Sequence, residues 1–177
     1  MNVKQWVSGL SRRCRAWAAG QSSSLLATGA GVFVLAATLV RAVSGSPYRH
    51  GVLLQYGEVI PPVWLMSLLW VVWYALLGAA LVYLLCGKRL PPSAQAARYR
   101  AGMLYLCMIF LGLFWYPLFF VGGHTFFAAL LVILVLALCV TCALWCRCAS
   151  RLVSMILFAH AGFLLWMVVL SVRVMFL

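Results

Sequence analysis

The sequence predicts an all-α integral membrane protein that folds as a single five-helix transmembrane bundle. Hydrophobic residues make up 67% of its 177 residues and charged residues only 8%, whereas soluble domains are roughly 45–50% apolar and about 25% charged. A soluble domain of this size cannot bury so many apolar side chains, because too much of a small folded body is surface. The apolar residues form long runs without alternation, which favours membrane-spanning helices over strands.

Five apolar runs are long enough to cross a bilayer as helices, which takes about 20 residues each. We expect these helices at residues 24–43, 59–86, 101–121, 126–145 and 152–175. Because they occupy most of the chain, we expect one transmembrane domain over residues 23–177. A basic amphipathic segment over residues 1–22 precedes it.

Turn residues separate the five runs. A Ser-Gly-Ser-Pro sequence at 44–47 ends the first run. Pro61 and Pro62 begin the second, since a helix start tolerates the missing N–H of proline. A Gly-Gly pair at 122–123 makes a tight turn between the third and fourth runs, and two arginines flank the link to the fifth. Such short links make neighbouring helices antiparallel.

Thirteen Lys and Arg residues stand against a single acidic residue, Glu58. The alternation of the spans places ten of the basic residues on one side of the membrane and only Arg41, Arg49 and Arg173 on the other. By the positive-inside rule, we expect the N-terminus on the basic side and the C-terminus on the opposite side. Because the basic residues lie at the ends of apolar runs, we expect membrane lipids as partners and no nucleic acid.

The basic segment over residues 1–22 has two interpretations. Its basic residues alternate with Trp6, Val7, Leu10 and Trp17, and it contains no acidic residue. This composition is typical of a mitochondrial targeting segment and equally of an amphipathic helix that lies on lipid headgroups. We therefore expect a multi-pass protein of a mitochondrial membrane, with a bacterial or another cell membrane as the alternative.

The shortage of acidic residues argues against catalysis. A single carboxylate excludes paired-carboxylate acid–base chemistry, and the absence of aspartate excludes a Ser-His-Asp triad. We therefore expect that the protein is not an enzyme. His50 and His124, in the expected loops, are too few to hold a metal ion without a third ligand, so we expect no metal site.

Two motifs in the second and third runs point to a known family. The second run contains Pro-Pro-Val-Trp at 61–64, a further Trp six residues later and a Tyr at position 74, and the third run contains Trp-Tyr-Pro-Leu-Phe-Phe at 115–120. These motifs resemble the TspO/MBR family of translocator proteins, whose second helix opens with Pro-Pro-x-Trp and whose third carries Trp-x-Pro-x-Phe-Phe. The resemblance covers residues 61–177. It implies a five-helix membrane bundle that binds an apolar ligand without catalysis.

The resemblance also implies which residues build the site. The positions that match the family's pocket are Met66, Ser67, Leu69, Trp70, Trp115, Phe127, Phe158, Gly162 and Leu165. The structural motif positions are Pro61, Pro62, Trp64, Tyr74, Pro117, Phe119 and Phe120. The family's polar positions on the third helix correspond to Met108 and Gly112, so the predicted pocket is apolar and suits a lipid tail better than a polar drug. The alternative for the aromatic residues is helix packing and interface anchoring.

Two further groups of residues have competing interpretations. His160 lies inside the fifth run, where an ionisable side chain is a functional candidate. The alternative is a neutral histidine that bonds a neighbouring backbone group or hydroxyl. Four cysteines, at 139, 142, 146 and 148, cluster at the end of the fourth run. We expect them to pack as small apolar side chains. The alternatives are a metal or redox role and palmitoylation of Cys146 or Cys148.

Two functions remain open. The first is non-enzymatic binding of an apolar tetrapyrrole, sterol or lipid inside the bundle, with porphyrin, haem or a bound lipid as the candidate cofactor. The second is that of a structural accessory subunit in a larger membrane assembly, such as a mitochondrial respiratory complex, with a degenerate pocket. The expected protein partners are accordingly other membrane-protein subunits or a second copy of the chain.

Overall fold

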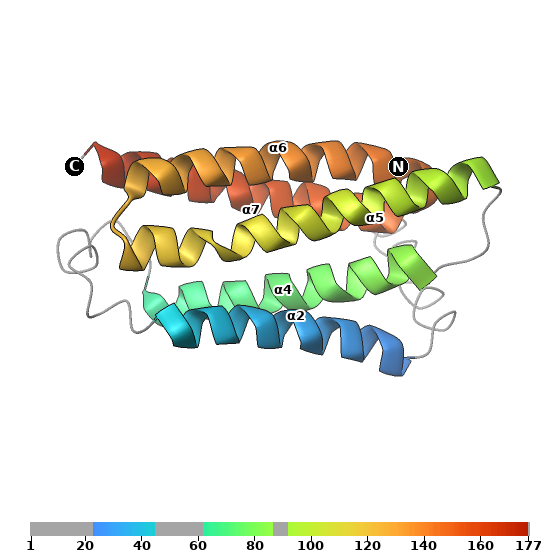
Figure 1. Cartoon of the computed structure of the whole chain (residues 1–177), viewed down its shortest axis with the longest axis horizontal. Helices are drawn as coiled ribbons and strands as arrows, with labels where there is room; N and C mark the ends of the chain where they lie inside the picture. Colours follow the sequence, from blue (N-terminus) through green and yellow to red (C-terminus); the bar gives the residue numbers. More distant parts are fainter. Residues whose placement is uncertain (1–22, 45–61, 87–91, 177) are drawn as a thin grey trace, which may run out of the picture.

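The computed structural model describes residues 23–44, 62–86 and 92–176, which form helices joined by short connections (Figure 1). The predicted basic segment at 1–22 lies outside the described residues. So do Pro61, Glu58 and His50. Their predicted roles therefore stay predictions.

The described residues contain the predicted membrane-spanning helices. In chain order they are α2 (Ser23–Ser44), α4 (Val63–Cys86), α5 (Pro92–Leu113), the π-helical turn η2 (Pro117–Val121), α6 (Thr125–Ala149) and α7 (Arg151–Met175). With α5 continuing into η2, five helices are long and apolar enough to cross a membrane. This confirms the predicted all-α, five-helix class.

The third spanning helix differs most from its expected range. It begins earlier, at Pro92, and is regular only up to Leu113. Pro117 has no N–H to donate, and the chain widens there into a π-helical turn in which the Gly122 N–H donates to the Pro117 carbonyl over 3.0 Å. Such turns restore bonding where proline interrupts a helix. Gly123 then reverses the chain with φ at +61°, a conformation that glycine adopts without steric cost.

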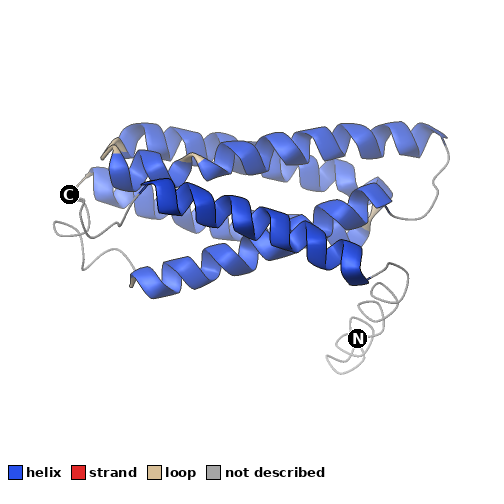
Figure 2. Ribbon diagram, turned by 60° about the horizontal axis from the view of Figure 1, so that its bottom comes forward, coloured by secondary structure: helices blue, strands red, loops and turns tan. Residues whose placement is uncertain are grey.

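The helices pack side by side along the long axis of the molecule, and consecutive helices run antiparallel (Figure 1, Figure 2). α6 packs against both α5 and α7, whereas α2 packs almost entirely on α4. α4 also contacts α5 and α7, and it thereby joins α2 to the rest of the bundle. With five spans, α2 begins at one end of the bundle and α7 ends at the other.

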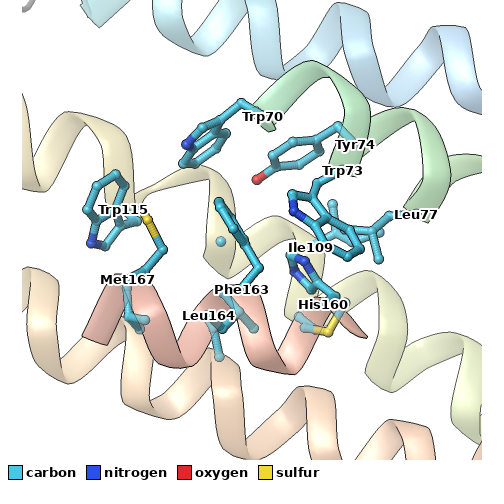
Figure 3. Close-up of a pocket in the computed structure, with 14 residues that line it drawn as sticks. Trp70, Trp73, Tyr74, Leu77, Ile109, Trp115, His160, Phe163, Leu164 and Met167 are labelled. Carbon is cyan, nitrogen blue, oxygen red and sulfur yellow. The ribbon is translucent and has the colours of Figure 1, made fainter. Parts of the chain in front are cut away.

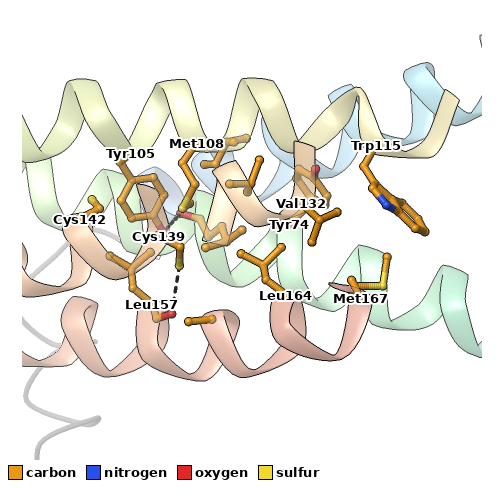
Figure 4. Packing of buried hydrophobic residues seen from close by; sticks show 14 of the residues in the cluster. Tyr74, Tyr105, Met108, Trp115, Val132, Cys139, Cys142, Leu157, Leu164 and Met167 are labelled. Carbon is orange, nitrogen blue, oxygen red and sulfur yellow. Dashed lines mark hydrogen bonds between the residues drawn. The ribbon is translucent and has the colours of Figure 1, made fainter. Parts of the chain in front are cut away.

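The apolar core lies between α4, α5, α6 and α7 (Figure 4). Its largest fully buried side chains are Trp115, Tyr105 and Phe119. The Tyr105 hydroxyl donates a hydrogen bond to the Leu77 carbonyl oxygen over 3.0 Å, which ties α5 to α4 and satisfies the buried phenol. Because four helices converge here, this core encloses the candidate site.

Candidate functional site

A small cavity lies where α4, α5, α6 and α7 meet (Figure 3). Its volume is about 30 Å³. The side chains around it are almost all apolar or aromatic, and none is charged. They are Trp70, Trp73, Tyr74, Leu77, Met108, Ile109, Gly112, Trp115, Val132, Val135, His160, Phe163, Leu164 and Met167.

A stack of aromatic rings forms one wall of this cavity. Trp70 stacks on Tyr74 with ring centroids 5.2 Å apart, and on Trp115 at 5.9 Å. Trp115 in turn stacks on Phe119 at 4.8 Å. The Trp115 indole N–H lies 3.4 Å from the Ser171 hydroxyl oxygen on α7, so the ring is held from two sides. The stack thus links the second-helix and third-helix motifs in one packed unit.

His160 enters the cavity from α7. Its side chain is 7% exposed, and its ring packs against Trp73 at 5.1 Å and Phe163 at 5.9 Å between centroids. Its Nδ1 atom has no hydrogen-bond partner among the residues that the structure describes. The predicted alternative of a histidine satisfied by a neighbouring protein group therefore does not hold for this nitrogen.

The size of the cavity decides what it can hold in this conformation. About 30 Å³ is enough for a water molecule, whereas pockets for drug-sized ligands measure roughly 300–1,000 Å³. A tetrapyrrole or a sterol therefore fits only after side chains move. Trp70, Trp73 and Phe163 are the aromatic residues with most freedom for that movement, because they are half-buried while Trp115 is 2% exposed.

The structure separates the predicted pocket residues into two groups. Trp70 and Trp115 line the cavity. Met66 is buried elsewhere in the core, and Ser67 and Leu69 are half-buried outside the lining. The four remaining residues lie on the outer surface of the bundle and do not line the cavity, contrary to expectation: Phe127 at 60% exposure, Phe158 at 43%, Leu165 at 55%, and Gly162.

The misplacement on α7 has a geometric reason. Positions 158, 162 and 165 follow helical spacing and share a face. The residues that reach the cavity are His160, Phe163, Leu164 and Met167. Because each helical residue turns about 100°, the stripe at 158, 162 and 165 faces a different side of α7 from the residues that line the cavity. The polar residues inside this span, Ser154, His160 and Ser171, are all buried, and their positions were the available signal for the inward side of α7.

The structural motif residues fall into buried and exposed sets. Tyr74 lines the cavity, and Phe119 and Phe120 are buried beside Trp115. Trp64 is 68% exposed at the start of α4, which suits an interface anchor. The Pro62 carbonyl accepts the first N–H bonds of α4, and Pro117 begins the π-helical turn. The motifs therefore shape the helix ends as well as the cavity wall.

The cysteine cluster is a packing feature of α6 (Figure 4). Cys139, Cys142 and Cys146 are fully buried. The Cys139 thiol donates to the Leu157 carbonyl at 3.2 Å and the Cys142 thiol to the Ala101 carbonyl at 3.4 Å. The alternative of palmitoylation at Cys146 does not fit this structure, because its thiol is buried. Cys148 is exposed. Within the described ranges, no three His, Cys, Asp or Glu side chains are grouped to hold a metal ion.

Comparisons with known proteins give one result. The family model of the TspO/MBR family matches residues 24–177, which is nearly the whole chain. The match includes α2, in which the sequence analysis identified no family motif. Neither the curated proteins nor the solved structures contain a match to this chain.

Proposed function

The chain belongs to the TspO/MBR family of membrane proteins, and on this basis we propose that it binds an apolar ligand inside its helix bundle without catalysing a reaction. The ligand class is a tetrapyrrole, a sterol or a lipid. The supporting observation is the uncharged, aromatic cavity enclosed by four helices. Flat aromatic walls favour a flat apolar ligand through stacking and apolar burial.

Binding requires the cavity to open. Trp70 is one of the half-buried rings that line the cavity, and it contacts both Tyr74 and Trp115 through ring stacking. Rotation of this half-buried ring towards lipid would create space without disturbing the fully buried helix contacts. In this proposal, ligand binding breaks the two stacking contacts of Trp70, and the ligand forms new contacts with the exposed rings in their place.

Two glycine substitutions give a matched test of the cavity. A Cβ at Gly112 would lie 3.5 Å from the Tyr74 hydroxyl oxygen and 3.9 Å from Val135, so Gly112→Ala fits in the closed state but takes space from a ligand. The control is Gly162→Ala, where the structure places no atom within 4 Å of the new Cβ. Both changes replace glycine by alanine inside a helix, so their effects on helix propensity are alike.

The measurement is quenching of tryptophan fluorescence in lipid nanodiscs by an uncharged porphyrin that carries no carboxylate groups, because the cavity lining offers no charged partner. We expect saturable quenching of the unmodified protein. Gly112→Ala should weaken binding about fivefold or more, equivalent to the roughly 1 kcal/mol that mild overpacking costs, and Gly162→Ala should not. Equal affinities for the two variants would place the porphyrin outside this cavity, and quenching without saturation would remove the porphyrin version of the proposal.

A second candidate function is that of an accessory subunit in a larger membrane assembly. Two observations favour it: the small cavity of about 30 Å³ and the outward apolar face of α2, which includes Val32, Leu35 and Leu39. The test is the native size of the protein after mild detergent extraction. Migration with other subunits supports the accessory role, and migration as one or two copies of 19.6 kDa contradicts it.

The mitochondrial membrane is the location that we propose for either function. The support is the basic, acid-free composition of residues 1–22, which is typical of mitochondrial targeting. Fractionation of the source cells tests this location, and recovery of the protein only from another membrane contradicts it.

A further inference from the structure

We propose that His160 selects ligands that carry a hydroxyl group, so that the site takes a neutral, flat, apolar molecule with one hydroxyl. The inference rests on the proposed binding function and adds a chemical requirement to it. It starts from the polar atoms at the cavity, because apolar walls alone cannot fix the orientation of a ligand.

The first observation is the unsatisfied nitrogen of His160. Its Nδ1 is buried and has no hydrogen-bond partner within the described part of the chain. Buried polar atoms in folded proteins are nearly always bonded, and an exception calls for a partner that the protein itself does not provide. Because the His160 side chain lines the cavity, a molecule inside the cavity can reach it.

The second observation is that the other cavity walls exclude charged ligands. The residues that line the cavity include no charged side chain, and a charge in the interior of a membrane bundle is costly. His160 is accordingly neutral in this site. Trp73 and Phe163 pack their rings against the imidazole, so a ligand that reaches His160 lies among aromatic rings, which favours a flat molecule.

The chemistry of neutral imidazole narrows the polar group. One ring nitrogen carries a proton and the other accepts a hydrogen bond. A hydroxyl satisfies Nδ1 in either tautomer, because it can donate to a bare nitrogen or accept from an N–H. A methyl ether of the same molecule cannot donate and is bulkier at that oxygen. The Tyr74 hydroxyl borders the same cavity and offers a second polar contact (Figure 3).

The test compares 1-hydroxypyrene with 1-methoxypyrene, which differ only at the oxygen. Binding is measured as the saturable part of energy transfer from tryptophan to pyrene in nanodiscs, at equal concentrations of each probe in the lipid. We expect the unmodified protein to prefer the hydroxyl compound roughly three- to tenfold, the range of one net hydrogen bond. Histidine labelled with ¹⁵N should show a shifted Nδ1 signal with the hydroxyl compound only.

Two variants assign the preference to His160. His160→Leu removes the nitrogen and should bind both probes equally. His160→Asn places an amide group where Nδ1 lies and should restore part of the preference, and it keeps the test valid if the leucine variant does not fold. Retention of the full preference in His160→Leu would overturn the assignment.

The outcomes also separate this inference from the proposed function. Equal binding of the two probes to the unmodified protein, together with saturable porphyrin quenching, overturns the role of His160 and leaves the binding function intact. That result would mean that Nδ1 holds only a water molecule. A hydroxyl preference without porphyrin binding supports the inference and contradicts the porphyrin version of the function. Absence of saturable binding by any probe overturns both.

Discussion

The α6–α7 pair and the α2–α4 pair are both antiparallel neighbours, yet they are held together in different ways. In the most apolar stretches of α6 and α7, 39% of the residues are buried, compared with 11% in α2. Among the α2 residues whose burial the structure describes, only Gly29 is buried. α6 and α7 are therefore covered by several helices, whereas α2 contacts the bundle on one face, almost entirely through α4.

Polar contacts to backbone and small side chains hold α6 and α7 together. The Ser154 hydroxyl donates to the Ala143 carbonyl over 2.8 Å, and the Cys139 thiol donates to the Leu157 carbonyl. Ser150, the single residue between the helices, caps α7 by accepting a bond from the Val153 N–H. Such small polar residues stabilise helix pairs in membranes, where lipid competes equally for apolar side chains.

Backbone proximity at two glycines holds α2 on α4. A Cβ added at Gly78 would overlap the Gly29 carbonyl oxygen, and it would lie 2.8 Å from the Phe33 ring. Close approach of this kind depends on small residues at the crossing point. We therefore expect α2, which packs almost entirely on α4, to be the helix most easily detached from the bundle. Lipid or a partner would then contribute most to its stability.

The largest effect is expected from breaking the glycine contact. Gly78→Ala should push α2 away from α4 and lower the free energy of unfolding by about 1–3 kcal/mol, the usual cost of overpacking. The control is Gly31→Ala, because no atom of the described chain lies within 4 Å of that new Cβ. Thermal unfolding in detergent measures both. Equal stability of the two variants would contradict the inference that close packing at Gly29 and Gly78 holds α2 on α4.

A smaller effect is expected from removing the hydroxyl between α6 and α7. Ser154→Ala removes the hydroxyl that donates from α7 to the Ala143 carbonyl of α6 and should cost about 0.6–1.7 kcal/mol, as hydrogen bonds between membrane helices do. Thr141→Ala is the matched control, since that exposed hydroxyl bonds only the Ala137 carbonyl of its own helix. If denaturant unfolding finds the two variants alike, the Ser154 bond does not hold the pair.

The smallest effect is expected at the exposed cysteine of the same helix. Cys148→Ser should change the free energy of unfolding by no more than about 0.5 kcal/mol, and it should remove maleimide labelling of α6 in the folded protein. Cys139, Cys142 and Cys146 should react only after unfolding, because they are fully buried. Mass spectrometry of the labelled peptides checks this, and fast labelling of Cys139, whose thiol bonds the Leu157 carbonyl of α7, would show a looser α6–α7 pair.

The sequence already contained the helices and the family, because both depend on local features. Each spanning helix follows from the length and hydropathy of one run, and Pro62, Gly123 and Ser150 mark helix ends by their own backbone chemistry. The Trp and Pro motifs carried the family resemblance. Two cavity residues, Trp70 and Trp115, were also found in this way.

Only the tertiary structure decided which faces meet and how much space they leave. α4 is apolar all round, so no periodicity distinguished Trp73 and Leu77, which line the cavity, from Val71 and Val72, which face outward. On α7, Phe158 and Leu165 lie on the outer surface, although the resemblance placed them in the pocket. The closure of the cavity depends on rings from separate helices that stack on one another. Hydropathy shows only that a side chain is apolar. In a membrane, lipid and the protein core are both apolar, so hydropathy does not distinguish a lipid-facing side chain from a buried one.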